Sequence, residues 1–161
     1  TAINHHLEAE DIAAITELVA AEVRRFNIEP KIALVTYSNF GSVPDGESAV
    51  LMRKATQIVH QKHPDWIVDG EMQAHLALDP DKLKEFYPFS KLVGHRANTL
   101  IFPNLSSANI AYNLLSTTSG IRVMGPILLG LKKPIHILQM GASVRQIVDM
   151  VGIAAIHAQD V

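Results

Sequence analysis

The sequence predicts an α/β fold, in which helices cover both faces of a parallel sheet to give three layers. Segments with helical periodicity alternate along the chain with short apolar segments, the order that parallel sheets with right-handed crossovers require. The segment 31–37 is apolar almost throughout, as expected for a strand that is buried on both faces. With 161 residues, 48 % of them apolar, the chain can bury a core of its own.

Two helices flank the first strand. Apolar residues recur at three- and four-residue spacing between 9 and 26, which predicts a helix that Pro30 cannot continue. The strand 31–37 and a polar loop at 38–42 follow. A second helix is predicted over 48–63, and a short strand over 66–68 that ends at Asp69-Gly70.

The second half continues the alternation. Asp79 followed by Pro80 is typical of a helix N-terminus, and that helix is expected to reach residue 87. A third strand is predicted over 98–102, a helix over 107–117 and a fourth strand over 121–124. Ser143 is expected to cap a last helix that reaches residue 157. Its inward-facing residues would be Val144, Ile147, Val148, Val151 and Ala155.

Composition excludes several classes of protein. The net charge of −2 provides no general field for nucleic acid, and the absence of cysteine excludes disulfide scaffolds and cysteine-ligated zinc. We expect no transmembrane helix and no membrane partner. The chain starts at Thr1 without a signal peptide, so we expect a cytoplasmic protein and a piece of a longer polypeptide. The mean hydropathy of +0.15 suggests buried contacts with other domains or subunits.

Four loops are expected at the carboxyl edge of the sheet, where open α/β sheets bind ligands: 38–42, 69–71, 103–107 and 125–126. Small or amide residues that precede a helix leave backbone N–H groups free for an anion, although ordinary turns and caps have the same composition. Asp69 and Glu71 are either an acid–base pair or hydrogen-bonding groups at a strand end. No nucleotide, zinc-protease or serine-hydrolase motif is present, and the histidines show no set of three metal ligands.

Several stretches resemble the carboxyl-terminal half of phosphate acetyltransferase (phosphotransacetylase), in register over nearly the whole chain. They are Asp-Gly-Glu-Met-Gln at 69–73, the segment 97–104 ending in Phe-Pro-Asn and followed by Leu105, the segment 108–112, and the segment 125–134. The chain is more similar still to the phosphotransacetylase-like domain of hybrid, NADP-dependent malic enzymes, at 37–42, 109–115, 134–138 and 144–150. The resemblance implies a phosphotransacetylase or isocitrate-dehydrogenase-like fold, with 1–161 as a fragment of one such domain.

The departures from this family concern its catalytic groups. Active members read Lys-Pro-Val-Asn-Asp-Leu-Ser-Arg-Gly where this chain has Lys-Pro-Ile-His-Ile-Leu-Gln-Met-Gly at 133–141. The family's serine therefore falls on Gln139, its arginine on Met140 and its catalytic aspartate on Gln146. A glutamine cannot take the proton of a thiol, and a methionine offers phosphate no charge. Asn39 and Phe40 likewise replace a threonine and a lysine. We therefore expect no catalytic residues and no metal site in this chain.

The resemblance implies a regulatory domain that binds acetyl-CoA as an effector and contributes to a homodimer or higher oligomer. NADP and a divalent Mg or Mn ion would belong to the malic-enzyme domain of the same polypeptide. The helix 143–158 is expected to lie exposed, or to pack on the missing half of the fold or on a partner chain. The expected ligand-binding residues are Ser38, Gly41 and Ser42 for the acyl end or an anion, Asn104, Asn109 and Tyr112 as cleft walls, Gly125 and Pro126 for close backbone approach, and Lys133, His136 and Arg145 for polar contacts.

Two other functions stay open from the sequence. One is an active phosphate acetyltransferase or butyryltransferase in which another group, such as His136 or Asp69, has taken over catalysis. The other is a structural module that holds oligomers together and binds no ligand.

Overall fold

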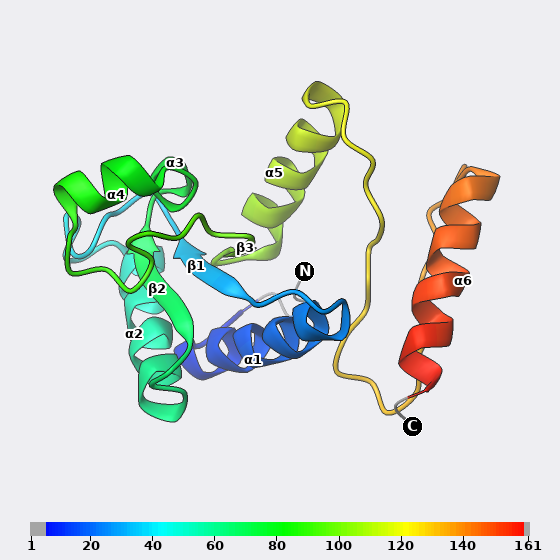
Figure 1. The fold of residues 1–161 in the computed structure, drawn as a ribbon, viewed down its shortest axis with the longest axis horizontal. Helices are drawn as coiled ribbons and strands as arrows, with labels where there is room; N and C mark the ends of the chain where they lie inside the picture. Colours follow the sequence, from blue (N-terminus) through cyan, green and yellow to red (C-terminus); the bar gives the residue numbers. More distant parts are fainter. Residues whose placement is uncertain (1–5, 160–161) are drawn as a thin grey trace. The chain divides into compact units, whose positions relative to one another are not determined.

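The computed structural model describes residues 6–159, and it alternates helices and strands as the sequence predicts (Figure 1). Within this part, one compact unit covers 6–108 and a second covers 109–159. The elements are α1 (Ala9–Arg25), β1 (Lys31–Val35), α2 (Glu47–Lys62), β2 (Ile67–Met72), α3 (Ala74–Ala77), α4 (Pro80–Phe86), β3 (Thr99–Ile101), α5 (Leu105–Thr118) and α6 (Val144–Ala158).

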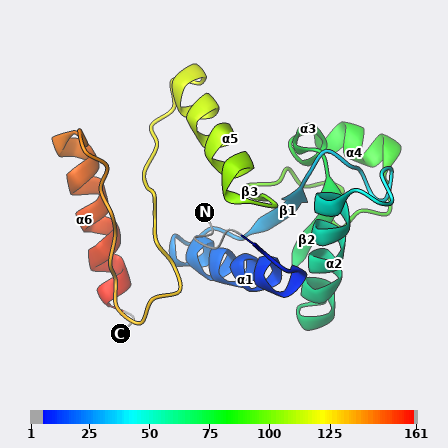
Figure 2. The same cartoon turned by 180° about the vertical axis from the view of Figure 1, so that it is seen from behind.

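The sheet has three parallel strands in the order β2-β1-β3, so the predicted fold class is confirmed. The chain leaves β1 through α2 to reach β2 on one side, then crosses back through α3 and α4 to β3 on the other side. Two right-handed crossovers that run in opposite directions must place their helices on opposite faces of the sheet. Figures 1 and 2 show this arrangement, with α3 and α4 across the sheet from α2.

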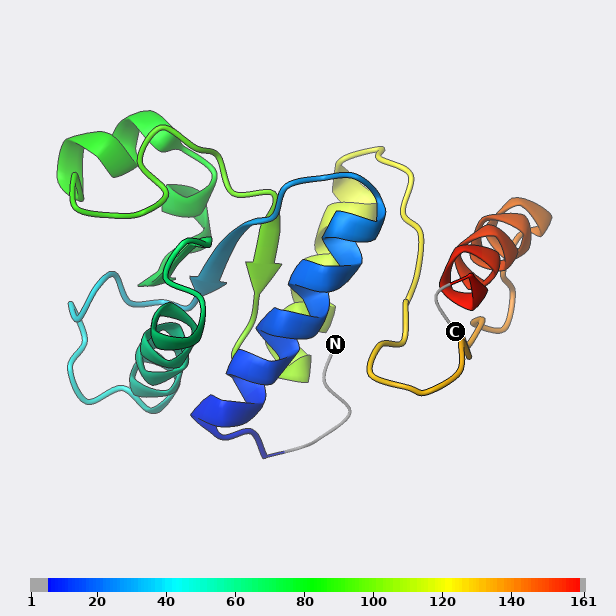
Figure 3. The ribbon, with the colours of Figure 1, turned by 60° about the horizontal axis from the view of Figure 1, so that its bottom comes forward.

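The side chains of β1 alternate between two core clusters, because successive residues of a strand point to opposite faces. Ile32 and Leu34 pack among residues of α1 and α2, whereas Ala33 and Val35 pack among residues that include α3 and α4. All four are at most 2 % exposed. Full burial of an aliphatic side chain of valine or leucine size contributes about 1.5–3 kcal/mol relative to exposure. Figure 3 shows α1 and α2 side by side along their face of the sheet.

Local signals predicted the helix ends well. The Asp79 side chain accepts a hydrogen bond from the Lys82 backbone N–H at 3.1 Å, and Pro80 occupies the first turn of α4. The Ser143 hydroxyl accepts one from the Gln146 N–H at 3.3 Å, which caps α6 as predicted. Both caps satisfy N–H groups that have no partner inside the helix.

Two strand predictions need correction. The segment 121–124 is not a strand, because it pairs with no strand among residues 6–159, and the apolar pattern that predicted it does not supply a hydrogen-bonding neighbour. β2 continues to Met72 instead of ending at residue 68, through polar residues that the apolar pattern did not include. The short helix α3 was also missed, since four residues are too few to show a period.

The burial predicted for α6 is wrong. Val144, Val148 and Val151 are 79 %, 62 % and 62 % exposed, and Ile147 and Ala155 are exposed as well. The buried residues of α6 are instead Met150, Ile153 and His157. Apolar residues occur on more than one face of this helix, so periodicity alone could not select the face that this unit covers.

Candidate functional site

The carboxyl ends of β1 and β2 form the candidate site. Open α/β sheets bind ligands outside the carboxyl ends of their strands. The connection after β1 leads to α2 on one face, and the connection after β2 leads to α3 on the other. The loop 38–42 and the residues 71–73 lie at this point.

A β-bulge places Glu71 against the loop 38–42. Leu34 pairs with Gly70 and Val35 pairs with Met72, so Glu71 is the extra residue of β2. Gly70 makes this approach possible, since a Cβ atom there would lie 2.6 Å from the Leu34 carbonyl oxygen. Bulges of this kind redirect a side chain. Here the carboxylate of Glu71 is fully buried and directed toward the loop 38–42 and α2.

Arg53 of α2 holds the buried carboxylate in a bidentate ion pair. Its Nε donates to Oε2 of Glu71 at 3.0 Å, and its Nη2 donates to Oε1 at 2.9 Å. Burial by itself would raise the pKa of the Glu71 carboxyl, but the hydrogen bonds from Arg53, Gly41 and Ser38 outweigh it and hold the pKa below its ordinary value. The same pair raises the pKa of Arg53. Glu71 is therefore an anion in the folded protein and is poorly suited to take up a proton at neutral pH.

The loop 38–42 folds around the same carboxylate. The buried Ser38 hydroxyl and the Gly41 backbone N–H donate to Oε1 of Glu71 at 2.9 and 2.8 Å, and the Phe40 N–H donates to the Glu71 carbonyl at 2.8 Å. Ser42 Oγ accepts from the Asn39 N–H at 2.9 Å. Three of the predicted ligand-binding residues, Ser38, Gly41 and Ser42, are thus brought together, and the first two form part of the hydrogen-bond network of Glu71.

The outer side of the loop carries an aromatic cluster. The ring of Phe40 lies 4.9 Å from that of Tyr87 and 5.0 Å from that of Phe89, centroid to centroid. These distances are those of attractive aromatic pairs. Phe89 is 68 % exposed, so the cluster presents an apolar surface next to the loop 38–42.

Asp69 does not share a site with Glu71. Its Oδ2 accepts hydrogen bonds from the Ser90 hydroxyl at 2.7 Å and from the Lys91 N–H at 2.8 Å, so it anchors the segment that follows α4. The two carboxylates are therefore hydrogen-bonding groups for two different loops, which favours that interpretation over an acid–base pair. Within 6–159, no three histidine, aspartate or glutamate side chains are grouped so that they could hold one metal ion.

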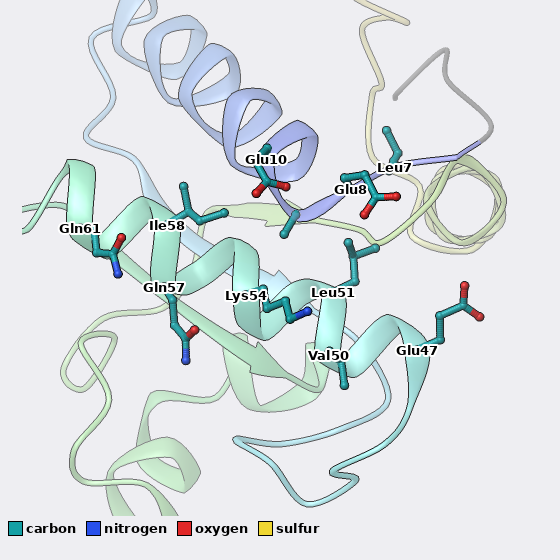
Figure 4. A pocket seen from close by; sticks show the side chains of 11 residues that line it. Leu7, Glu8, Glu10, Glu47, Val50, Leu51, Lys54, Gln57, Ile58 and Gln61 are labelled. Atoms are coloured by element: carbon teal, nitrogen blue, oxygen red, sulfur yellow. The ribbon is translucent and has the colours of Figure 1, made fainter.

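Two adjoining cavities lie in the first unit. One, of about 520 Å³, opens at the ends of β1 and β3 and includes Tyr37, Ser48 and Asn104 in its lining. The other, of about 510 Å³, lies between the start of α1 and the outer face of α2 (Figure 4). Both are lined by Leu7, Glu8, Glu47 and Leu51.

The other predicted ligand-binding residues divide between the two units. Asn104 precedes α5, where its Oδ1 accepts from the Ser107 N–H at 2.9 Å. The remainder lie in the second unit: Asn109 and Tyr112 on α5, Gly125, Pro126, Lys133 and His136 in the segment between the helices, and Arg145 on α6. The His136 ring lies 5.1 Å from that of His157, and its Nδ1 accepts from the Leu128 N–H at 3.4 Å.

Sequence reasoning missed Arg53. A usable signal was present, because Arg53 stands four residues after the buried Ala49 and next to the buried Met52, on the flank of α2 that faces the core. A cation in such a position needs an anionic partner. The identity of that partner, 18 residues further along the chain, could not be inferred from the pattern.

Comparison with known proteins identifies the family. A family model described as phosphate acetyl/butaryl transferase matches residues 1–155. The chain belongs to this family. Solved phosphotransacetylases have the same fold: one from Streptococcus pyogenes superposes with a TM-score of 0.91 at 35 % identity, covering 99 % of this chain and 48 % of that one. The predicted resemblance is confirmed.

Within the phosphate acetyl/butaryl transferase family, the chain is similar to part of the malic enzymes. It is 46 % identical over 159 residues to an NADP-dependent malic enzyme of Haemophilus influenzae and 45 % identical over 161 residues to one of Escherichia coli. In both cases 99 % of the chain matches 21 % of the relative, so the chain spans about a fifth of the length of these enzymes. A phosphate acetyltransferase of Clostridium acetobutylicum is 35 % identical, and 47 % of its length is covered.

The positions onto which the resemblance places the family's catalytic groups lie in the second unit. Met140 is fully exposed, and Gln139 is exposed next to it. The side-chain carbonyl of Gln146 accepts hydrogen bonds from the Ser143 N–H at 2.8 Å and from the Ser143 hydroxyl at 3.1 Å, so this side chain serves as a helix cap. No helix within 6–159 has the combination of length and apolarity needed to cross a membrane.

Proposed function

We propose that this chain is the regulatory domain of a cytoplasmic, NADP-dependent malic enzyme, that it binds acetyl-CoA as an effector, and that it does not catalyse acyl transfer. One observation carries the proposal. The family fold is retained, while the three positions onto which the resemblance places the family's catalytic groups hold Gln139, Met140 and Gln146.

The chemistry of these residues is unsuited to acyl transfer to phosphate. Attack of the CoA thiol requires a group that removes its proton, and Gln146 has none to offer. Loss of a general base typically lowers the rate by about 10²–10⁴-fold. Phosphate recognition favours a planar, charged, bidentate donor, which Met140 lacks. The Gln146 side chain also caps α6, so the glutamine at this position has a structural role.

Retention of a binding site is supported by the order of the loop at the ends of β1 and β2. The loop 38–42 is tied to Glu71 by hydrogen bonds from Ser38, Phe40 and Gly41, so contacts within the protein hold its conformation. A fixed loop lowers the entropy cost of binding. We propose that this loop and Asn104, in the first unit, contact acetyl-CoA; the candidates between Asn109 and Arg145, in the second unit, stay predictions from the sequence.

Regulation requires a difference in affinity between two states of the whole enzyme. We propose that the malic-enzyme part binds malate, NADP and a divalent Mg or Mn ion, and converts malate to pyruvate. Inhibition by acetyl-CoA would require it to bind the less active state more tightly, with a coupling free energy of about 1–3 kcal/mol. The names of the malic-enzyme relatives support this assignment of the parent activity.

The test is a calorimetric titration with acetyl-CoA, with free CoA and NADP as comparison ligands, followed by malic-enzyme assays of the full-length protein. We expect saturable binding of acetyl-CoA, tighter than that of NADP, and a change in malic-enzyme rate over the same concentration range. A rate that ignores acetyl-CoA would refute the regulatory role. Measurable acetyl transfer from acetyl phosphate to CoA would instead support an active transferase.

A second function, oligomerisation, is supported by the exposed apolar face of α6. Val144, Val148 and Val151 are each more than 60 % exposed on this helix. We propose that this face packs on another part of the longer polypeptide or on a partner chain. Sedimentation of the full-length protein is expected to show a dimer or higher oligomer, and replacement of Val148 by aspartate is expected to shift it toward monomer. A monomer across micromolar concentrations would refute this function.

A further inference from the structure

The ion pair between Arg53 and Glu71 connects three elements that are distant in sequence. Arg53 belongs to α2 and Glu71 to the bulge of β2, and the remaining side-chain hydrogen bonds of Glu71 come from Ser38 and Gly41 of the loop after β1. Arg53 Nη2 also lies 3.4 Å from the carbonyl oxygen of Val43, just beyond that loop. The pair is therefore positioned to control the conformation of the loop 38–42.

The loop needs such a restraint. Phe40 has φ +45° and Gly41 has φ +90°, two successive residues in the left-handed region. A residue with a side chain rarely adopts this conformation, which persists only where the surroundings enforce it. The backbone N–H groups of both residues donate to Glu71, one to its carbonyl and one to its carboxylate. Glu71 thus stabilises a conformation that the loop would not keep by itself.

Stability alone is a poor explanation for the pair. Glu71 is fully buried and Arg53 is 30 % exposed, and burial of a charge loses so much solvation that replacement of an ion pair by apolar residues is often neutral or favourable for folding. The guanidinium of Arg53 keeps Glu71 charged and fixes both of its oxygens by two parallel hydrogen bonds, which orients Oε1 toward the Ser38 hydroxyl and the Gly41 N–H. The arrangement suits precise placement of the loop.

We infer that Arg53, acting through Glu71, is a positioning residue that fixes the loop 38–42 for ligand binding. This inference rests on the proposed function for the identity of the ligand, acetyl-CoA. Arg53 itself need not touch the ligand, because its two hydrogen bonds are directed to Glu71.

The experiment compares Arg53→Met and Arg53→Lys with wild type in the full-length protein. Methionine keeps most of the apolar stem but removes the charge and both hydrogen bonds, whereas lysine keeps the charge without the bidentate geometry. Amide hydrogen exchange at Phe40 and Gly41 reports the order of the loop, and calorimetry reports the affinity for acetyl-CoA. For Arg53→Met we expect both exchange to accelerate and affinity to fall by about tenfold or more, as for loss of a hydrogen bond to a charged group. For Arg53→Lys we expect an exchange rate and an affinity between those of wild type and Arg53→Met.

Asp69→Asn is the matched control. It removes a buried carboxylate charge from the same strand, but Asp69 restrains Ser90 and Lys91 instead of the loop 38–42. We expect its exchange at Gly41 and its affinity for acetyl-CoA to stay within about twofold of wild type.

The outcomes separate the two proposals. Unchanged exchange at Phe40 and Gly41 in both Arg53 variants would overturn the positioning role. Faster exchange with unchanged acetyl-CoA affinity would show that the loop is not part of the binding site, and would overturn the inference as stated. If wild type binds no acetyl-CoA, the proposed function is wrong, and the exchange data alone decide whether Arg53 orders the loop. Equal loss of affinity in Asp69→Asn and Arg53→Met would assign the effect to general destabilisation and would also overturn it.

Discussion

Replacement of Gly70 by alanine tests the packing that creates the bulge in β2. A Cβ atom at this position would lie 2.6 Å from the Leu34 carbonyl oxygen, 2.9 Å from Leu34 Cβ and 3.2 Å from the Thr56 hydroxyl. The first two distances are far shorter than van der Waals contact. The Leu34 carbonyl belongs to the backbone of the central strand, so it cannot retreat without disturbing the pairing of β1 with β2.

The magnitude follows from two contributions. Overpacking in a rigid core typically costs about 1–3 kcal/mol. The backbone of Gly70, at φ +157°, falls where residues with a side chain are strained, at a cost of order 1–3 kcal/mol. We therefore expect Gly70→Ala to lower the free energy of unfolding by about 2–6 kcal/mol, a large part of the total of about 5–15 kcal/mol for an ordinary domain.

Urea unfolding followed by tryptophan fluorescence measures this effect, because Trp66 packs against the core of the same unit. Gly152→Ala is the control of opposite sign. Gly152 lies inside α6, and a Cβ atom there would meet nothing within 4 Å, so alanine should stabilise that helix by about 0.5–1 kcal/mol. A Gly70→Ala protein within about 0.5 kcal/mol of wild type would refute the reasoning, since the close approach would then be relieved without cost.

Three further predictions concern single side chains. The pKa of Glu71 is lowered in the folded protein, so the charged carboxylate stabilises the fold above the unfolded pKa of about 4.3, and this contribution is lost as pH falls through the folded pKa. Acid titrations of unfolding should therefore show a smaller loss of stability below pH ~4.3 in Glu71→Gln than in wild type, and equal losses would contradict the shift. Ser143→Ala removes the cap of α6 and should cost the helix about 1 kcal/mol by thermal circular dichroism, with Ser143→Thr retaining most of it. Met140→Ala should change stability by less than about 0.5 kcal/mol in the same assay, because the side chain is fully exposed, and a larger loss would show that it is covered.

Much of the fold could be predicted because its signals are local. The helix α1 follows from the spacing of Ile12, Val19 and Val23, and Pro30 limits how far it can continue. The caps at Asp79 and Ser143 were also predicted, because the capping side chain and the N–H groups that it satisfies lie within three residues of each other.

The fourth strand and the buried face of α6 could not be predicted in the same way. Extended backbone at 121–124 becomes a strand only with a hydrogen-bonding neighbour, which the residues themselves do not specify. Helix α6 has apolar residues on more than one face, and burial selects Met150 and Ile153 over Val148 and Val151. Which face is covered depends on what packs there.

By itself, the sequence determined the α/β class and the family, because residue identity and spacing carry this information, while the loss of the family's catalytic side chains at 139, 140 and 146 stays a prediction from the resemblance. Only the tertiary structure decided that Glu71 is the extra residue of a bulge, and that Arg53 and the loop 38–42 meet on its carboxylate. The physical reason is that a buried charge selects its partners by distance and hydrogen-bond geometry across elements, and these are set by strand pairing and helix packing.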